Sequence, residues 1–443
     1  LVMADDLGWG DVGFNGNRVI RTPNLDAWAA AGVRLTRFYS AAPVCSPTRA
    51  SCLTGRHPFR QGIYSANVGH LRPQEINLAE VLRRHGYATG HFGKWHLGTL
   101  TREVRDSNRG GPRGIEHYAP PWERGFETCF STEAKVPTWD PMVKPAGKAP
   151  SQGWAALKPG DPREPYGTRY WTGPETPATE NLDGDDSRII MDRVVPFLER
   201  AVAADKPFFA VVWFHTPHLP VVAGPSYAAM YEAYDLYTRN YYGAITAMDE
   251  QVGRLRRTLQ RLGVERRTLV FFCSDNGPEG RAGKAPGSAG PYRGRKRSLY
   301  EGGVRVPAFV AWPDRLPAGR TIDVPCVTSD YLPTILEAVG LRVPELASRP
   351  MDGLSLWPIL EGRVTERGRP IGFQHGAQRS LTGDRWKLYT PDKGRNWELY
   401  DLKADPAESR NVAAEHPDVV RRLRSVLEEW VASCKASDEG RDY

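Results

Sequence analysis

The sequence predicts an α/β fold in which helices cover both faces of a sheet. Short apolar runs alternate with helical patterns along the 443 residues of the chain. Strands that are buried on both faces are apolar throughout, and alternation with helices is typical of a parallel sheet. We expect such strands at residues 1–4, 88–92, 208–214, 269–273 and 306–311.

An amphipathic helix between the third and fourth of these strands supports the same fold class. Its apolar residues recur every three or four positions, which places them on one face of a helix. They are Ile245, Met248, Val252, Leu255, Leu259 and Leu262. A helix with one apolar face between two apolar strands is expected to pack on the sheet.

The chain is predicted to have two parts. Residues 1–362 form an α/β domain, and the Gly-, Pro-, Trp- and Tyr-rich region at about 102–186 forms long ordered loops, which commonly build the walls of a binding site. Short strands at 386–389 and 398–400 precede a final amphipathic helix. Residues 363–443 therefore form a C-terminal α+β subdomain with a small antiparallel sheet.

Composition excludes several classes of protein. With 40% hydrophobic and 25% charged residues, the chain is an ordinary globular protein. The net charge of +7 is explained equally well by an anionic substrate and by a generally arginine-rich proteome. The chain has no long basic arm that would indicate binding to nucleic acid. No apolar run is long enough for a transmembrane segment, and the six cysteines form no C-x-x-C pair. Because the sequence opens inside a strand, we expect further residues upstream of Leu1, and the lack of a signal peptide in this sequence carries no conclusion.

The segment from Val44 to Arg56, VCSPTRASCLTGR, predicts a helix with a cysteine at its entrance. Ser46 suits an N-cap, Pro47 the first helical position and Gly55 the helix end. Cys45 would then lie just outside the helix N-terminus, where an anion is favoured, with Arg49 in the first turn. The alternative is that Cys45 is merely a small apolar residue under a loop.

Acidic residues follow two of the expected strands. Asp5 and Asp6 end the first, and Asp275 and Asn276 end a later one. Ligands of α/β sheets gather at the carboxyl ends of strands, and converging carboxylates would repel one another without a cation. All-oxygen ligands favour calcium or magnesium over zinc. Alternatively, each Asp caps the following turn.

Lys94 and His96 form a candidate catalytic pair in the segment GKWHLG. If this segment is extended, residues two apart point to the same side. One could then hold an oxyanion while the other moves a proton. The alternative is an exposed lysine next to a hydrogen-bonded histidine.

Two further basic segments are candidates. His215 and His218 follow the strand at 208–214, and one of them is expected to be structural. Lys296 lies in a basic loop between Arg295 and Arg297, and the sequence leaves open which of the three points inward.

The segment from Cys45 to Arg56 resembles the C-x-P-x-R-x4-T-G-R signature of the type I sulfatases, which belong to the alkaline phosphatase superfamily. Other family marks appear in order, at residues 3–8, 22–26, 93–98, 217–220, 274–277, 300–307 and 398–408. The resemblance covers nearly the whole chain apart from about 102–186. It implies an alkaline-phosphatase-like fold, with a large mixed, mostly parallel sheet flanked by helices and a small C-terminal antiparallel sheet.

The resemblance also implies hydrolysis of sulfate esters by a modified Cys45. A maturation enzyme that reads Pro47, Arg49 and the Thr-Gly-Arg tail would oxidise the cysteine to formylglycine, whose aldehyde hydrates to a geminal diol. One hydroxyl would attack sulfur, and the second would lose its proton so that the aldehyde reforms and sulfate leaves. A thiol or a serine lacks that second hydroxyl.

Roles for the other candidates follow from the same resemblance. The expected metal ligands are Asp5, Asp6, Cys45, Asp275 and Asn276, and the expected ion is Ca²⁺, with Mg²⁺ as an alternative. Arg49 would orient the diol. Lys94 and Lys296 would bind the sulfate. His96 would take the proton of the second hydroxyl, and His218 would lie near the leaving oxygen of the substrate.

The expected substrate is an aryl sulfate or a terminal sulfate on a saccharide. Aromatic rings in the long loops could stack on a sugar or could pack the loops themselves, with equal weight; they are Trp122, Trp139, Trp154, Tyr170 and Trp171. Further anionic groups could be read by His117, Arg124 and Arg169. Two other functions stay open, a phosphodiesterase or phosphonate hydrolase and a non-catalytic protein that binds sulfated glycan. The family suggests a periplasmic or secreted protein.

Overall fold

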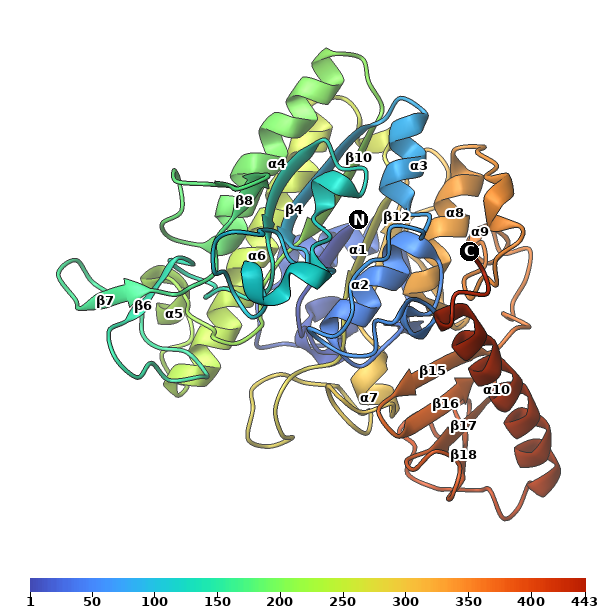
Figure 1. Cartoon of the computed structure of the whole chain (residues 1–443). Helices are drawn as coiled ribbons and strands as arrows, with labels where there is room; N and C mark the ends of the chain where they lie inside the picture. Colours follow the sequence, from blue (N-terminus) through green and yellow to red (C-terminus); the bar gives the residue numbers. More distant parts are fainter.

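The computed structural model describes residues 1–443 and confirms the predicted α/β fold (Figure 1). Its centre is a ten-stranded mixed sheet. In spatial order the strands are β13 (Arg320–Ile322), β2 (Val33–Leu35), β12 (Phe309–Ala311), β11 (Val270–Ser274), β1 (Val2–Ala4), β10 (Phe208–Trp213), β4 (Ala88–Lys94), β5 (Thr128–Thr132), β8 (Trp171–Gly173) and β9 (Thr176–Pro177). The five strands that the sequence predicted for the main sheet are present as β1, β4, β10, β11 and β12.

The five central strands β11, β1, β10, β4 and β5 run parallel. Met3 pairs with Trp213 on one side and with Cys273 on the other, and Lys94 pairs with Thr132. This register brings the carboxyl ends of all five strands to one edge of the sheet. The residues that follow them therefore meet at that edge.

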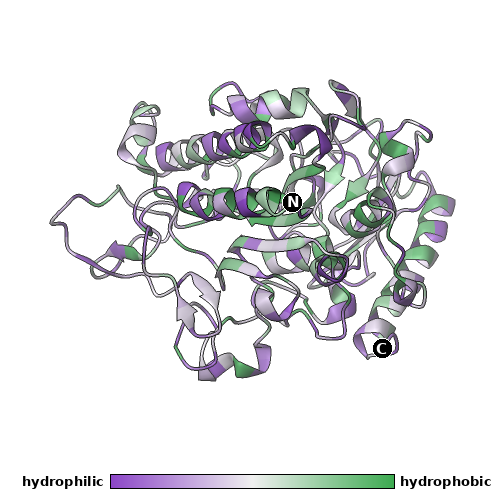
Figure 2. Cartoon of the chain, turned by 90° about the horizontal axis from the view of Figure 1, so that it is seen from above, coloured by the Kyte–Doolittle hydropathy of each residue, from purple (hydrophilic) through white to green (hydrophobic).

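Helices cover the sheet on both faces. One face carries α1 (Pro23–Ala30), α4 (Asp186–Ala203) and α6 (Leu236–Arg261), and the other carries α2 (Cys45–Thr54), α3 (Leu78–Arg84), α8 (Tyr331–Ala338) and α9 (Trp357–Leu360). Alternate strand residues enter opposite cores, so Val2 packs with α4 and α6 whereas Met3 packs with α2 and α8. In Figure 2 hydrophilic and hydrophobic residues alternate along the long helices. None of the helices combines the length and apolar character needed to cross a bilayer.

The strand expected at 306–311 is shorter in the structure. Only Phe309–Ala311 form β12, which runs antiparallel to β11. Pro307 has no N–H to donate, so it does not extend the ladder toward Val306.

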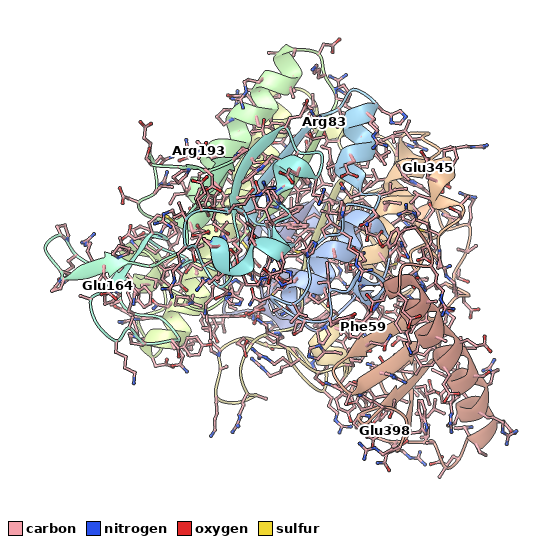
Figure 3. The ribbon with its side chains drawn as sticks, viewed as in Figure 1. Phe59, Arg83, Glu164, Arg193, Glu345 and Glu398 are labelled. Carbon is pink, nitrogen blue, oxygen red and sulfur yellow. The ribbon has the colours of Figure 1, made fainter.

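The region 102–186 contains more regular structure than the predicted loops. It holds β5, β8 and β9 at the edge of the main sheet, and a hairpin of β6 (Val143–Pro145) and β7 (Arg163–Pro165). Figure 3 labels Glu164 on this hairpin, which projects from the body of the molecule. Short elements elsewhere are β3 (Phe38–Tyr39) paired with β14 (Cys326–Val327), and α5 (Pro225–Ala229).

The C-terminal part forms a four-stranded antiparallel sheet with one long helix, drawn in red in Figure 1. The strands are β15 (Ile371–His375), β16 (Gln378–Thr382), β17 (Trp386–Thr390) and β18 (Glu398–Asp401), and the helix is α10 (Pro417–Asp438). Leu381, Leu388 and Leu399 form a small core with Leu427 of α10. The small antiparallel sheet implied by the family resemblance is therefore present.

Buried charges join this C-terminal sheet to the main domain. The Lys387 ammonium on β17 lies 3.0 Å from Glu301 Oε1 and 2.9 Å from Glu408 Oε1, and all three side chains are excluded from solvent. Glu301 begins α7 (Glu301–Val304), just after the loop that carries Lys296. Breaking a buried ion pair typically costs about 3–5 kcal/mol, so this contact holds the two parts rigidly together.

A second contact anchors α10. Arg60, on the 3-10 turn Pro58–Gln61, donates to Ser437 of α10 at 2.9 Å and to Asp352 at 2.7 Å. Phe59 of the same turn lies at this junction in Figure 3. The C-terminal part is thus fixed to the segment that follows α2.

Candidate active site

Acidic side chains converge where β1 and β11 end. The Asp6 N–H donates to Asp275 Oδ1 at 3.1 Å, and Asn276 Nδ2 donates to Asp6 Oδ1 at 2.7 Å. Asp5, Asp6, Cys45 and His218 each present a possible ligand atom, and these atoms lie within 4.8 Å of one another. The structure therefore brings together the residues predicted to hold a metal ion.

These residues fit a hard divalent cation. Asn276 Oδ1 is buried and has no hydrogen-bond partner. A buried amide oxygen without a partner is costly, whereas a cation would satisfy it. Asp5, Asp6 and Asp275 supply further oxygens, which is the donor set of calcium and magnesium sites.

Helix α2 starts two residues earlier than the sequence predicted, because Pro47 was expected as its first residue. Cys45 is its first residue rather than its neighbour, and Ser46 is not the N-cap, because its Oγ is buried without a partner. Thr48 instead closes the helix entrance: its hydroxyl donates to the Ala42 carbonyl at 3.0 Å and accepts from the Ala42 N–H at 3.3 Å. Gly55 ends the helix with φ of +68°, as predicted.

Cys45 lies at the bottom of the site with its thiol enclosed. The residue is 1% exposed, and Sγ lies 3.7 Å from Asp5 Oδ1. Burial raises the pKa of the Cys45 thiol to about 12, although Lys296 and Lys94 oppose the shift. The unmodified side chain is therefore a neutral thiol in this environment.

Arg49 is buried among the metal-site carboxylates. It lies in the second turn of α2, not the first as predicted, because the helix starts at Cys45. Its Nε and Nη2 donate to Asp275 Oδ2 at 3.2 and 2.7 Å, and Nη1 donates to the Lys94 carbonyl at 3.0 Å. Its contacts thus hold Asp275 next to the end of β4, and its predicted contact with the diol stays a prediction.

Two lysines from different segments reach the carboxylates. Lys94, the last residue of β4, places Nζ 2.6 Å from Asp5 Oδ2, and Lys296 places Nζ 2.7 Å from Asp6 Oδ2. Although burial alone would lower it, the pKa of Lys94 is raised by Asp5. Both ammonium groups are therefore charged and lie next to the cluster that contains Cys45.

The structure resolves which residue of the basic loop points inward. The Lys296 side chain is 5% exposed, whereas that of Arg297 is 60% exposed. Arg297 forms a two-pronged pair with the Glu279 carboxylate at 2.6 and 2.9 Å, and Arg295 donates to the Glu279 carbonyl at 2.8 Å. Lys296 is thus the inward residue, as the family pattern implied.

His96 lies at the site, but the backbone conformation that places it there differs from the predicted extended one. The segment is not extended, because His96 has φ of +57° and Gly93 has φ of +100°. His96 Nε2 donates to Asn67 Oδ1 at 2.9 Å, and its Nδ1 is buried without a partner. His96 still lines the same cavity as Lys94.

The two histidines after β10 have different roles. His215 is fully buried and bonds Asp186 and Thr132, which makes it structural. His218 Nδ1 donates to the Leu219 carbonyl at 2.6 Å, which leaves Nε2 free, 3.6 Å from Asp6 Oδ2. Burial lowers the pKa of His218 well below its usual value, and Lys296 and Lys94 add to this effect.

A cavity of about 480 Å³ opens above Cys45. The predicted residues Cys45, Lys94, His96, His218 and Lys296 line it. Lining residues that sequence reasoning missed are Ser65, Asn67, Asn108, Lys135, Glu279 and His375. Lys135 follows β5, so recognising that strand would have placed it at the same edge, whereas nothing in the sequence pattern connects His375 of β15 with this cavity.

Two of the aromatic residues that could either stack on a sugar or pack the loops have contacts that fit the packing alternative. Tyr170 and Trp171 are fully buried; the Tyr170 hydroxyl donates to Asp186 and the Trp171 Nε1 donates to Asp106. None of the five aromatic candidates lines the cavity, nor do His117, Arg124 or Arg169. The contacts of Tyr170 and Trp171 therefore fit the packing alternative, and a role of His117, Arg124 and Arg169 in binding further anions stays a prediction.

The family model and the relatives that match this chain are all sulfatases. The family model "Sulfatase" matches residues 1–341, and the model "N-sulphoglucosamine sulphohydrolase, C-terminal" matches residues 294–433. The chain is 32% identical to steryl-sulfatase of Mus musculus, over 98% of this chain and 81% of the relative. It is 32% identical to N-acetylgalactosamine-6-sulfatase of Canis lupus familiaris, over 93% of this chain and 75% of the relative.

A solved structure shares the fold over nearly the full length. Ps i-CgsB, solved in complex with k-i-k-neocarrahexaose, superposes with a TM-score of 0.79 at 26% identity. The match covers 98% of this chain and 92% of the solved chain.

Proposed function

Because this chain belongs to the sulfatase family and is a sulfuric ester hydrolase, we propose that it removes sulfate from a sulfated saccharide by means of an oxidised Cys45 and one divalent cation. The observation that carries the proposal is the position of Cys45 at the bottom of a cavity where Lys94, Lys296 and His218 converge. A saccharide is favoured because one relative is a hexosamine sulfatase and one solved neighbour holds an oligosaccharide.

We assign the cation to the oxygens of Asp5, Asp6, Asp275 and Asn276, next to residue 45. A divalent ion held there supplies Lewis-acid polarisation of an oxygen. Calcium suits this donor set, and magnesium is the alternative. Arg49 keeps Asp275 in place through its two hydrogen bonds to Oδ2.

Oxidation of Cys45 supplies an aldehyde whose hydrate has one hydroxyl for attack and a second for release of sulfate. The surrounding residues bind and stabilise the transferred group. Lys94 and Lys296 offer positive charge in the cavity that Cys45 lines, where sulfate oxygens gain charge during transfer. His96 is placed to take a proton on its unpartnered Nδ1.

The primary test compares turnover of matched aryl sulfate and aryl phosphodiester substrates by the metal-loaded protein. The proposal expects sulfate to be the better substrate. Mass analysis of the peptide Val44–Arg49 in the same preparation should show loss of sulfur from Cys45. Retained sulfur on every molecule, together with full sulfatase activity, would contradict the proposed nucleophile.

His218→Ala is expected to impair substrates with poor leaving groups most. His218 Nε2 is free and lines the cavity, and once the charge of a bound sulfate ester favours protonation of the ring, this nitrogen can serve as proton donor to the departing alcohol. An activated aryl sulfate needs little protonation, whereas a sugar sulfate needs it fully. We expect a loss of about 10²–10⁴-fold in kcat for the sugar ester and a much smaller loss for the aryl ester. Equal losses on both substrates would argue against this role.

Oxidation of Cys45 is expected to require an unfolded chain. Cys45, Pro47, Arg49, Thr54 and Arg56 are all buried. Arg56 also forms ion pairs with Glu75 and Asp442. A maturation enzyme could therefore not reach the signature in the folded protein.

The expected result is that a formylglycine-generating enzyme converts the denatured unmodified protein, or the peptide 44–56, at least about tenfold faster than the folded protein. Mass spectrometry of residue 45 over time measures this. Equal rates would mean that the segment opens readily in the native state.

A further inference from the structure

Three lysines line the cavity above Cys45, and one of them has no partner. Lys94 is paired with Asp5, and Lys296 with Asp6 and Glu279. Lys135 makes no side-chain hydrogen bond and has no carboxylate oxygen within 4.0 Å of its ammonium. The charge of Lys135 is therefore available to a ligand in a way that the other two charges are not.

The fold places Lys135 next to the catalytic edge of the sheet. It lies three residues after β5, whose last residue Thr132 pairs with Lys94 of β4. The Thr132 hydroxyl donates to the Ala134 carbonyl at 2.7 Å. This hydrogen bond fixes the short segment between β5 and Lys135. Lys135 thus stands on a fixed wall of the cavity.

The position of Lys135 disfavours its charged form. The side chain is half-buried, and burial lowers its pKa, with Lys94 and Lys296 adding to the effect. An ammonium that loses part of its hydration without gaining a partner is unfavourable. A bound anion would supply the missing partner.

We propose that Lys135 binds a second anionic group of the substrate, so that the enzyme prefers saccharides with a further sulfate or carboxylate close to the sulfate being removed. This inference rests on the proposed sulfatase function.

The positions of the other cations favour a second group over the transferred sulfate. Lys94 and Lys296 already lie against the carboxylates around Cys45, whereas the Lys135 ammonium is more than 4.0 Å from Asp5 and Asp6. Arg297 also lines the cavity, but both of its terminal guanidinium nitrogens, Nη1 and Nη2, donate to Glu279. An anion elsewhere in the cavity therefore has Lys135 as its unpaired cationic partner.

The cavity is also large enough for more than one substituent. Its volume of about 480 Å³ is in the range of sites that hold a small molecule, beyond what a single sulfate group fills. Ser65, Asn67, Asn108 and Ser151 line the rest with neutral polar groups. These can bind sugar hydroxyls without competing for the Lys135 charge.

The test compares wild type with Lys135→Met in the metal-loaded, oxidised protein. Inhibition of aryl sulfate turnover is measured with pairs of sugars that differ by one anion. N-acetylglucosamine 6-sulfate against glucosamine 2-N,6-O-disulfate reports on a second sulfate. N-acetylgalactosamine 6-sulfate against its glucuronate-linked disaccharide reports on a carboxylate. Inhibition constants are obtained whether or not a sugar is hydrolysed.

Lys148→Met is the matched control, because Lys148 is exposed, lies outside the cavity and loses the same charge. Lys135→Arg should restore part of the preference, since it restores the charge. For wild type we expect tighter binding of at least one dianionic partner, by about 10- to 100-fold, as a charge-assisted hydrogen bond provides. Lys135→Met should remove that preference, and Lys148→Met should keep it.

Two outcomes would overturn the inference. Wild type without preference for either dianion would show that no second anion is bound. A loss in Lys135→Met that is equal for mono- and dianionic sugars would place Lys135 on the transferred sulfate instead. Failure of the proposed function looks different, because wild type would then turn over no aryl sulfate, and the inference would fall with it.

Discussion

Cys45→Ala is expected to abolish sulfate ester hydrolysis, with a loss of about four orders of magnitude or more, and to leave the fold intact. The thiol is 1% exposed and makes a single weak contact, 3.7 Å from Asp5, so alanine removes little packing. The reaction, in contrast, loses its nucleophile. Cys45→Ser should be inactive or stop at a trapped ester, because serine has one hydroxyl where the hydrated aldehyde has two.

Aryl sulfate turnover and thermal unfolding measure this prediction. Cys52→Ala is the matched control, since Cys52 is a buried cysteine of the same helix that packs in the hydrophobic core. It should lose a little stability and keep its activity. Rates like those of wild type in Cys45→Ala would refute the mechanism.

Asp275→Asn is expected to lose both metal and activity. Asp275 is fully buried, offers Oδ1 at the strand-end cluster, and binds Arg49 through Oδ2. The substitution removes a charge from the cation site and leaves the Arg49 guanidinium short of a partner. Breaking a buried ion pair costs about 3–5 kcal/mol, and we expect a destabilisation near the lower figure because Asp5 lies 3.5 Å from the same guanidinium.

Metal content after dialysis, the unfolding temperature with and without added calcium, and aryl sulfate turnover together measure this prediction. Calcium should stabilise wild type by binding the native state, and it should do so much less for Asp275→Asn. Asp330→Asn is a suitable control, because Asp330 forms a comparable buried pair with Arg367 at 2.7 Å away from the cavity. It should be less stable but retain its metal. Full occupancy and full activity in Asp275→Asn would remove Asp275 from the ligand set.

The strand ends show how far local patterns can predict a site. Asp5 and Asp275 follow short apolar runs, and runs of that length and composition form central strands wherever helices cover both faces. The carboxyl ends of parallel strands meet at one edge of the sheet. Because each aspartate directly follows a strand in the sequence, the two aspartates are predicted to lie close together. Lys94 was predictable for the same reason.

Local patterns failed where the backbone or a distant segment decided the outcome. Extended geometry was expected at His96, but Gly93 and His96 both have positive φ, which sequence alternation does not reveal. Ser46 looked like a cap, but its hydroxyl is buried without a partner, and Thr48 instead bonds the Ala42 carbonyl outside the helix. At both positions the tertiary structure overrode the local propensity.

The order of residues along the chain was sufficient for the fold class, the acidic strand ends and the helix that presents Cys45, because these depend on periodicity and on which residue follows which strand. The tertiary structure decided which charged side chains form ion pairs. Lys94 and Lys296 pair with aspartates, Arg297 pairs with Glu279, and Lys135 pairs with no carboxylate. Such pairing depends on distances of a few ångströms between remote segments, and electrostatic interaction energy changes steeply over that range.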